Sequence, residues 1–122
     1  VSADQVGELM HTSAAVMVTS RWLENSTMTM LEAMLAGRCV IVPDRGPLRE
    51  WVSDGQTGRL FKPDDLDSLV KVTRQVLSDP AARAEMGRAG KELTTKRHDP
   101  KLISDRLEIL YREAINRCEL RC

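Results

Sequence analysis

The sequence lacks a dominant charge, a long apolar run and internal repeats. Its 18 lysine and arginine residues balance 18 aspartate and glutamate residues, so the formal net charge is zero. This balance argues against a dedicated nucleic-acid binder, which would carry a basic face. No apolar stretch reaches the roughly 20 residues that a helix needs to span a bilayer, and no signal-peptide pattern opens the chain. We therefore expect a protein without a transmembrane segment.

Cysteine is also scarce, with only Cys39, Cys118 and Cys122 in the chain. An odd and widely spaced set predicts free thiols rather than a disulfide framework. It also groups too few ligands for a zinc site, so no metal is expected. Free thiols fit a reducing compartment, and we expect a cytoplasmic location, with peripheral attachment to a membrane left open.

What the sequence does contain is an alternation of helical and strand patterns. Helical spacing predicts helices at about 3–12, 26–36 and 65–77, a short helix after Gly46-Pro47, one from Pro80 and a last one after Pro100. Short apolar runs predict strands at about 14–19, 39–42 and 59–61. This order predicts a three-stranded parallel α/β sheet with a helical C-terminal segment. The apolar residues expected to face the core from the helices are Leu31, Met34, Leu35, Leu48, Trp51, Val52, Leu66, Leu69, Val70, Val76, Leu77, Ala82, Met86, Ala89, Leu93, Leu102, Ile103, Leu107, Leu110, Ala114 and Ile115.

The stretch from Trp22 to Met34 carries the chemistry. It follows the first predicted strand and opens a helix, for which Asn25 or Ser26 is the expected N-cap. Free N–H groups at such a helix start form an anion site at the carboxyl edge of the sheet. Glu24 precedes the helix, and Glu32 lies roughly 9 Å along its axis from the start. We therefore expect a diphosphate at the helix start with a carboxylate on either side.

This stretch resembles the donor-binding signature of retaining glycosyltransferases with the GT-B fold, the glycosyl transferases group 1 (glycosyltransferase family 4). The signature pairs two glutamates with seven residues between them, as Glu24 and Glu32 are paired here. Further motifs follow in the family's order, and the resemblance covers about residues 5 to 100. These motifs are Gly37-Arg38-Cys39-Val40-Ile41, Asp44-Arg45-Gly46-Pro47-Leu48-Arg49-Glu50, Asp54-Gly55-Gln56-Thr57-Gly58, Lys62-Pro63-Asp64-Asp65 and Leu77-Ser78-Asp79-Pro80.

The resemblance implies that residues 1–122 are part of the C-terminal, nucleotide-sugar-binding domain, half of a Rossmann-like GT-B nucleotide-binding domain. It implies transfer of a sugar, of the hexosyltransferase type, from a nucleotide-diphosphate sugar to an acceptor hydroxyl with retention, without a metal or other cofactor. The family's phosphate-binding Gly-rich turn, its Arg/Lys pair and its acceptor-binding lobe have no counterpart here. We therefore interpret the chain as a fragment, and we expect the isolated chain to be inactive without the missing N-terminal half and lobe.

The resemblance also implies roles for individual residues. Glu24, the one catalytic candidate, would contact the hydroxyls of the donor sugar, and Glu32 those of the nucleotide ribose. The full donor-binding set is Glu24, Asn25, Ser26, Thr27, Met28, Glu32 and Gly46. Each role has a plainer alternative. Glu24 and Glu32 could be solvated, Asn25, Ser26 and Thr27 could simply cap the helix, and Met28 could pack in the core. Trp22 could stack on the donor or anchor the loop from below.

Two other functions remain open from the residues. The first predicted strand has no obvious partner on one side, and an exposed apolar edge strand favours pairing with another chain. A non-catalytic module that associates through this edge, with itself or with another protein, is therefore the alternative function. A receiver-like or phosphorylase-like domain is weaker, because a receiver needs acidic residues clustered at strand ends, where only Asp44 qualifies.

Overall fold

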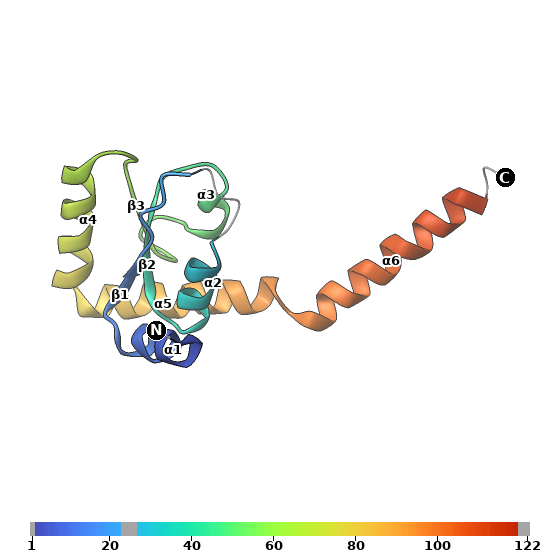
Figure 1. Cartoon of the computed structure of the whole chain (residues 1–122), viewed down its shortest axis with the longest axis horizontal. Helices are drawn as coiled ribbons and strands as arrows, with labels where there is room; N and C mark the ends of the chain where they lie inside the picture. The colour runs from blue at the N-terminus through green and yellow to red at the C-terminus, as the bar shows by residue number, and fades with distance from the viewer. Residues whose placement is uncertain (1, 23–26, 120–122) are drawn as a thin grey trace.

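A computed structural model describes residues 2–22 and 27–119 of the chain. Figure 1 shows a body of strands and helices from which the last helix extends. The elements are α1 (Ala3–Thr12), β1 (Ala15–Met17), α2 (Met28–Leu35), β2 (Cys39–Pro43), α3 (Leu48–Trp51), β3 (Arg59–Phe61), α4 (Leu66–Ser78), α5 (Pro80–Arg97) and α6 (Pro100–Glu119). The predicted order of helices and strands is confirmed.

The three strands form one parallel sheet in the order β1-β2-β3. Strand β2 is central, and all five of its residues are buried, as expected for a strand covered on both faces. Strand β1 pairs with β2 along one side only within the described residues, with Val16 opposite Val40. The edge strand expected from the sequence is therefore present.

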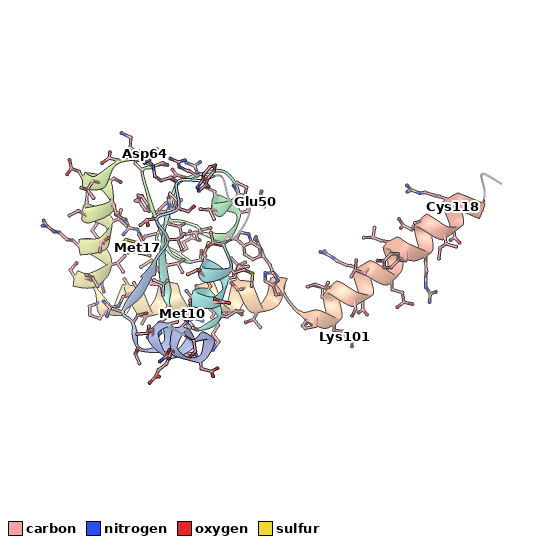
Figure 2. The ribbon with its side chains drawn as sticks, viewed as in Figure 1. Met10, Met17, Glu50, Asp64, Lys101 and Cys118 are labelled. Atoms are coloured by element: carbon pink, nitrogen blue, oxygen red, sulfur yellow. The ribbon has the colours of Figure 1, made fainter. Side chains whose placement is uncertain are left out.

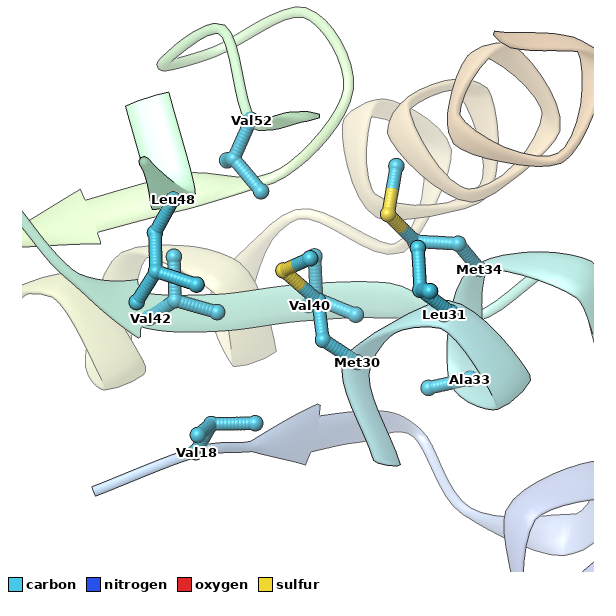
Figure 3. Close-up of a cluster of buried hydrophobic side chains, with 9 residues drawn as sticks. All are labelled: Val18, Met30, Leu31, Ala33, Met34, Val40, Val42, Leu48 and Val52. Atoms are coloured by element: carbon cyan, nitrogen blue, oxygen red, sulfur yellow. The ribbon is translucent and has the colours of Figure 1, made fainter. Parts of the chain in front are cut away.

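Two core clusters lie on opposite faces of the sheet, because successive residues of β2 point to opposite sides. Figure 3 shows the first cluster, in which Val40 and Val42 meet Met30 and Met34 of α2 and Leu48 of α3. The second cluster joins β2 to β3, α4 and α5, and it consists of Cys39, Ile41, Phe61, Val72, Val76 and Met86.

Local signals explain where several helices begin and end. Asp65 caps α4 by accepting a hydrogen bond from the Ser68 N–H at 2.9 Å. Asp79 caps α5 in the same way, with Pro80 as its first residue, where the missing N–H costs nothing. Gly37 follows α2 with a φ of 72°, a left-handed conformation that glycine adopts without strain.

Helix α5 lies very close to the turn between α2 and β2. A methyl group built on Gly87 would lie 2.2 Å from the carbonyl oxygen of Gly37, so only glycine allows this approach. Gly90 lies close to Thr57 in the same way: a methyl group built on Gly90 would lie 3.0 Å from the Thr57 carbonyl oxygen. These contacts hold α5 across α2 and β2.

Some details of the sequence prediction are wrong. Helix α2 begins at Met28 with Thr27 as its N-cap, whose hydroxyl accepts from the Met30 N–H at 3.1 Å, whereas Asn25 or Ser26 was expected. Asn25 and Ser26 lie outside the described residues. Strand β1 is shorter than the predicted 14–19.

The apolar stripes were also predicted to be more buried than they are. Of the residues expected in the core, Leu35, Leu66, Val70, Leu77 and Ala82 are exposed. Every residue of α6 from 100 to 118 is exposed as well, because α6 extends away from the body, as Figure 1 shows. Periodicity identifies an apolar face, but it does not say whether another element covers that face.

Candidate functional site

The carboxyl ends of the three parallel strands lie at one edge of the sheet, where ligands of open α/β sheets bind. The described parts of the loops that leave this edge are residues 18–22 after β1, 44–47 after β2 and 62–65 after β3, and Thr27 directly precedes α2. Figure 2 shows Asp64 at this edge and Met10 at the opposite end of the body. The candidate donor site is built from these loops and the start of α2.

An ionic network ties the three loops together. The Arg45 guanidinium donates one hydrogen bond to the Arg21 carbonyl oxygen at 2.8 Å and forms a second contact with the Asp64 carboxylate. Arg21 reaches the same carboxylate, with Nε 3.2 Å from Oδ1. Two guanidinium groups therefore share one carboxylate, which leaves the network with an excess positive charge. An anion is the complement to such a charge.

Sequence reasoning missed this network. It included Arg45 and Asp64 only as members of the family motifs, and it predicted no ion pair between them or with Arg21. In the structure the Arg45 side chain is half-buried, at 22% exposure. A positive φ of 59° at Asp64 marks the tight turn after β3, and Lys62-Pro63-Asp64-Asp65 is the sequence signal for that turn.

The turn after β2 is held by its own ion pair. Asp44 accepts from the Arg49 guanidinium, which holds the pKa of the Asp44 carboxyl below its ordinary value. Gly46 adopts a φ of 36°, and a methyl group built there would meet nothing within 4 Å. The turn therefore presents open backbone at the carboxyl edge, as its predicted place beside a nucleotide requires.

The start of α2 contributes backbone amides. The first N–H groups of a helix have no intrahelical partners, and the Thr27 hydroxyl takes one of them, that of Met30. Thr27 itself is buried, whereas Met28 is 68% exposed, so the predicted contact of Met28 with a ligand is sterically open. The other predicted residues at this point, Glu24, Asn25 and Ser26, lie outside the described residues.

Glu32 lies on the exposed side of α2. It lines a cleft of about 490 Å³ between α1 and α2, and the remaining lining residues are Val6, Gly7, Met10, His11, Leu35 and Ala36. A second cleft of about 450 Å³ lies beside the ionic network, lined by Thr19, Arg21, Phe61, Asp64, Asp65, Leu66 and Leu69. The predicted site residues with described positions are thus spread from the carboxyl edge, at Thr27 and Gly46, to the α1–α2 cleft at Glu32.

Other side chains near the site have simpler roles. Trp22 is 82% exposed, so it is not the buried anchor that was one of its two interpretations.

Over residues 2–22 and 27–119, no group of three or more histidine, cysteine or acidic side chains is placed to hold a metal ion. Within the same ranges, none of the helices has the length and apolar character that crossing a membrane requires.

Comparison with known proteins identifies the relatives of this chain. The sequence model of the family "Glycosyl transferases group 1" matches residues 1–93. Lipopolysaccharide 1,2-N-acetylglucosaminetransferase of Salmonella typhimurium is 31% identical over 108 residues, which cover 88% of this chain and 28% of that protein. Glycogen synthase of Mycobacterium tuberculosis is 32% identical over 103 residues, or 84% of this chain and 25% of that protein.

The fold has solved counterparts. Sucrose-phosphate synthase from Thermosynechococcus elongatus superposes with a TM-score of 0.84 at 25% identity, over 94% of this chain and 29% of that one. The α/β arrangement is that of GT-B glycosyltransferases, as expected from the sequence. The chain spans only about a quarter of the length of the curated relatives it matches.

Proposed function

Because the chain belongs to the glycosyl transferases group 1 family, we propose that it forms the donor-binding part of an enzyme that transfers a sugar from a nucleotide-diphosphate sugar to an acceptor hydroxyl with retention of configuration. The observation that carries this proposal is the excess positive charge of the Arg21–Arg45–Asp64 network at the edge where α2 begins. The names of two relatives, an N-acetylglucosaminetransferase and a glycogen synthase, support sugar transfer.

In the proposed complex the diphosphate lies at the start of α2, where Thr27 and Met28 stand in the described part and Asn25 and Ser26 precede them. Helix amides and nearby guanidinium groups stabilise the charge that develops on the leaving diphosphate. This arrangement does not call for a metal ion or another cofactor. Catalysis then rests on orientation and electrostatics more than on a nucleophile.

The carboxylates select the sugars. A carboxylate accepts two hydrogen bonds from neighbouring hydroxyls, which suits a vicinal diol. We assign the ribose hydroxyls to Glu32 and the hydroxyls of the transferred sugar to Glu24, the catalytic candidate. Gly46 brings open backbone to the nucleotide. Because the chain spans about a quarter of the length of its relatives, we propose that acceptor binding and the rest of the donor pocket lie outside it, and we expect binding without turnover from the chain alone.

A titration tests the proposal. UDP, GDP and ADP are added separately to the ¹⁵N-labelled chain while amide shifts are followed, with saturable shifts expected around Thr27, Glu32 and Gly46. Glu32→Gln should weaken binding about tenfold, because a hydrogen bond to a charged group contributes about 1.5–3 kcal/mol. Glu113→Gln, which changes an exposed glutamate of α6, serves as the matched control. The absence of a saturable shift with any of the three nucleotides would refute the proposal.

Association through β1 is the second candidate function. Within the described sheet β1 is an edge strand, and its Met17 is 41% exposed. Such an edge presents unpaired backbone groups to another strand. If this association is the function, the chain forms a dimer that Met17→Lys weakens, as measured by sedimentation equilibrium. A monomer at all concentrations would rule out self-association.

A further inference from the structure

The C-terminal end of α5 packs against the end of α3. The Arg97 guanidinium carbon lies 4.9 Å from the centroid of the Trp51 ring, a distance typical of a cation–π contact. The His98 ring stacks on the same indole, with centroids 5.2 Å apart and an angle of 7° between the planes. Trp51 is in turn packed against the first core cluster. We call Trp51, Arg97 and His98 the tryptophan clasp.

Side-chain donors also satisfy the carbonyl groups at the end of α3, and one of them belongs to the clasp. A helix leaves its last carbonyl oxygens without intrahelical partners. Arg97 donates from Nη1 to the Glu50 carbonyl oxygen at 2.7 Å, and the Thr57 hydroxyl donates to that of Trp51 at 3.2 Å. Figure 2 labels Glu50 on α3, above the end of α5. The end of this four-residue helix is therefore held by side chains from α5 and from the loop before β3.

The other end of α3 is continuous with the turn at the candidate donor site. The Leu48 N–H donates to the Arg45 carbonyl oxygen at 3.1 Å, and the Arg49 N–H donates to that of Gly46 at 3.3 Å. Asp44 and Arg49 form the ion pair across the same turn. Since the turn carbonyls take part in the first hydrogen bonds of α3, a shift of α3 moves the turn.

From this connection we propose that Arg97 and Trp51 are positioning residues for the donor: they fix α3 and thereby hold the backbone of Arg45 and Gly46 in the geometry that receives the nucleotide. The inference rests on the proposed function and deepens it. Neither residue belongs to the loops at the carboxyl edge, since Trp51 ends α3 and Arg97 ends α5, and each acts through α3. Arg97 is 47 residues away in sequence from the carbonyl group that it holds.

The first experiment measures the clasp without any ligand. Amide hydrogen exchange of α3 is compared in the wild-type chain, Arg97→Ala and Arg97→Lys. Arg97→Ala should speed exchange of the Leu48, Glu50 and Val52 amides about three- to tenfold, since an exposed cation–π contact and one hydrogen bond are lost. Arg97→Lys keeps the cation and should restore part of the protection.

Matched variants separate the clasp from a general effect of mutation. Arg112→Ala removes another exposed arginine, paired with Glu108 on α6 at 2.7 Å, and should leave exchange in α3 unchanged. Trp51→Phe keeps an aromatic face, so its rate of amide exchange in α3 should lie between those of the wild-type chain and Trp51→Leu. Equal exchange in α3 for Arg97→Ala and Arg112→Ala would overturn the proposal.

The second experiment connects the clasp to the donor. The dissociation constants of UDP, GDP and ADP are measured for the same variants. For the nucleotide that binds, Arg97→Ala should raise the dissociation constant by about the factor by which it speeds amide exchange in α3. Faster exchange in α3 with unchanged affinity would overturn the positioning role while leaving the proposed function standing. No binding to the wild-type chain would refute the proposed function instead, and the exchange data would still decide whether the clasp fixes α3.

Discussion

Replacing Gly87 with alanine tests the close crossing of α5 over the turn between α2 and β2. A methyl group at this position would lie 2.2 Å from the carbonyl oxygen of Gly37 and 3.0 Å from its carbonyl carbon. Both are backbone atoms, so no change of rotamer relieves the clash. Helix α5 must move away, and Met86, which is buried in the second core cluster, moves with it.

Two effects of opposite sign determine the result. Alanine is about 1 kcal/mol more favourable than glycine in a helix, whereas overpacking costs typically 1–3 kcal/mol, and we expect more when rigid backbone is the obstacle. We therefore expect Gly87→Ala to lower the free energy of unfolding by about 1–3 kcal/mol. For a chain of this size, each kcal/mol lowers Tm by about 4 °C.

Urea unfolding followed by far-UV circular dichroism measures this change, and Gly7→Ala is the matched control. Gly7 is also helical, but a methyl group there would meet nothing within 4 Å. The control should therefore raise the free energy of unfolding by about 0.5–1 kcal/mol. If Gly87→Ala were as stable as the wild-type chain while Gly7→Ala behaved as expected, the inferred crossing of α5 would be wrong.

Three further outcomes are expected. Thr27→Ala should lower the free energy of unfolding by about 1–2 kcal/mol through loss of the α2 cap. Thr27→Ser keeps a capping hydroxyl, so in the same urea assay its free energy of unfolding should stay close to that of the wild-type chain. The Asp44 pKa lies below its ordinary value of 3.8 because Arg49 donates to the carboxylate. This pair therefore stabilises the fold above pH 3.8 and loses that effect as the pH falls through the Asp44 pKa. Arg49→Gln should raise that pKa, and an unchanged carboxyl titration by NMR would contradict the pairing. Burial raises the pKa of the Cys39 thiol to about 11, so a thiol reagent at pH 8 should label exposed Cys118 in the folded chain and Cys39 only after unfolding.

The order of the elements was predictable because each is encoded over a short range. The apolar run at β2, the Asp-Pro pair before α5 and the left-handed glycine after α2 act within a few residues of themselves. The helix caps show the limit of such signals. Asn25, Ser26 and Thr27 are all good N-caps by residue type, and only the structure shows that the Thr27 hydroxyl meets the Met30 amide.

The candidate site was predictable in part. The polar run after β1 and the glycine turn after β2 follow from local pattern, and the structure places Thr27 and Gly46 at the edge expected of them. The link between Arg21 and Asp64 spans 43 positions in sequence. Such a pair forms only when the chain has folded, so no local pattern could predict it.

The amino-acid sequence by itself determined the fold class, the family and the residues proposed to bind the donor, because hydrophobic period, turn chemistry and motif spacing are local properties of the chain. Only the tertiary structure decided which apolar faces are covered, which guanidinium groups share the Asp64 carboxylate and how Arg97 reaches α3. The physical reason is that burial and long-range pairing depend on where other elements lie, and that arrangement exists only in the folded protein.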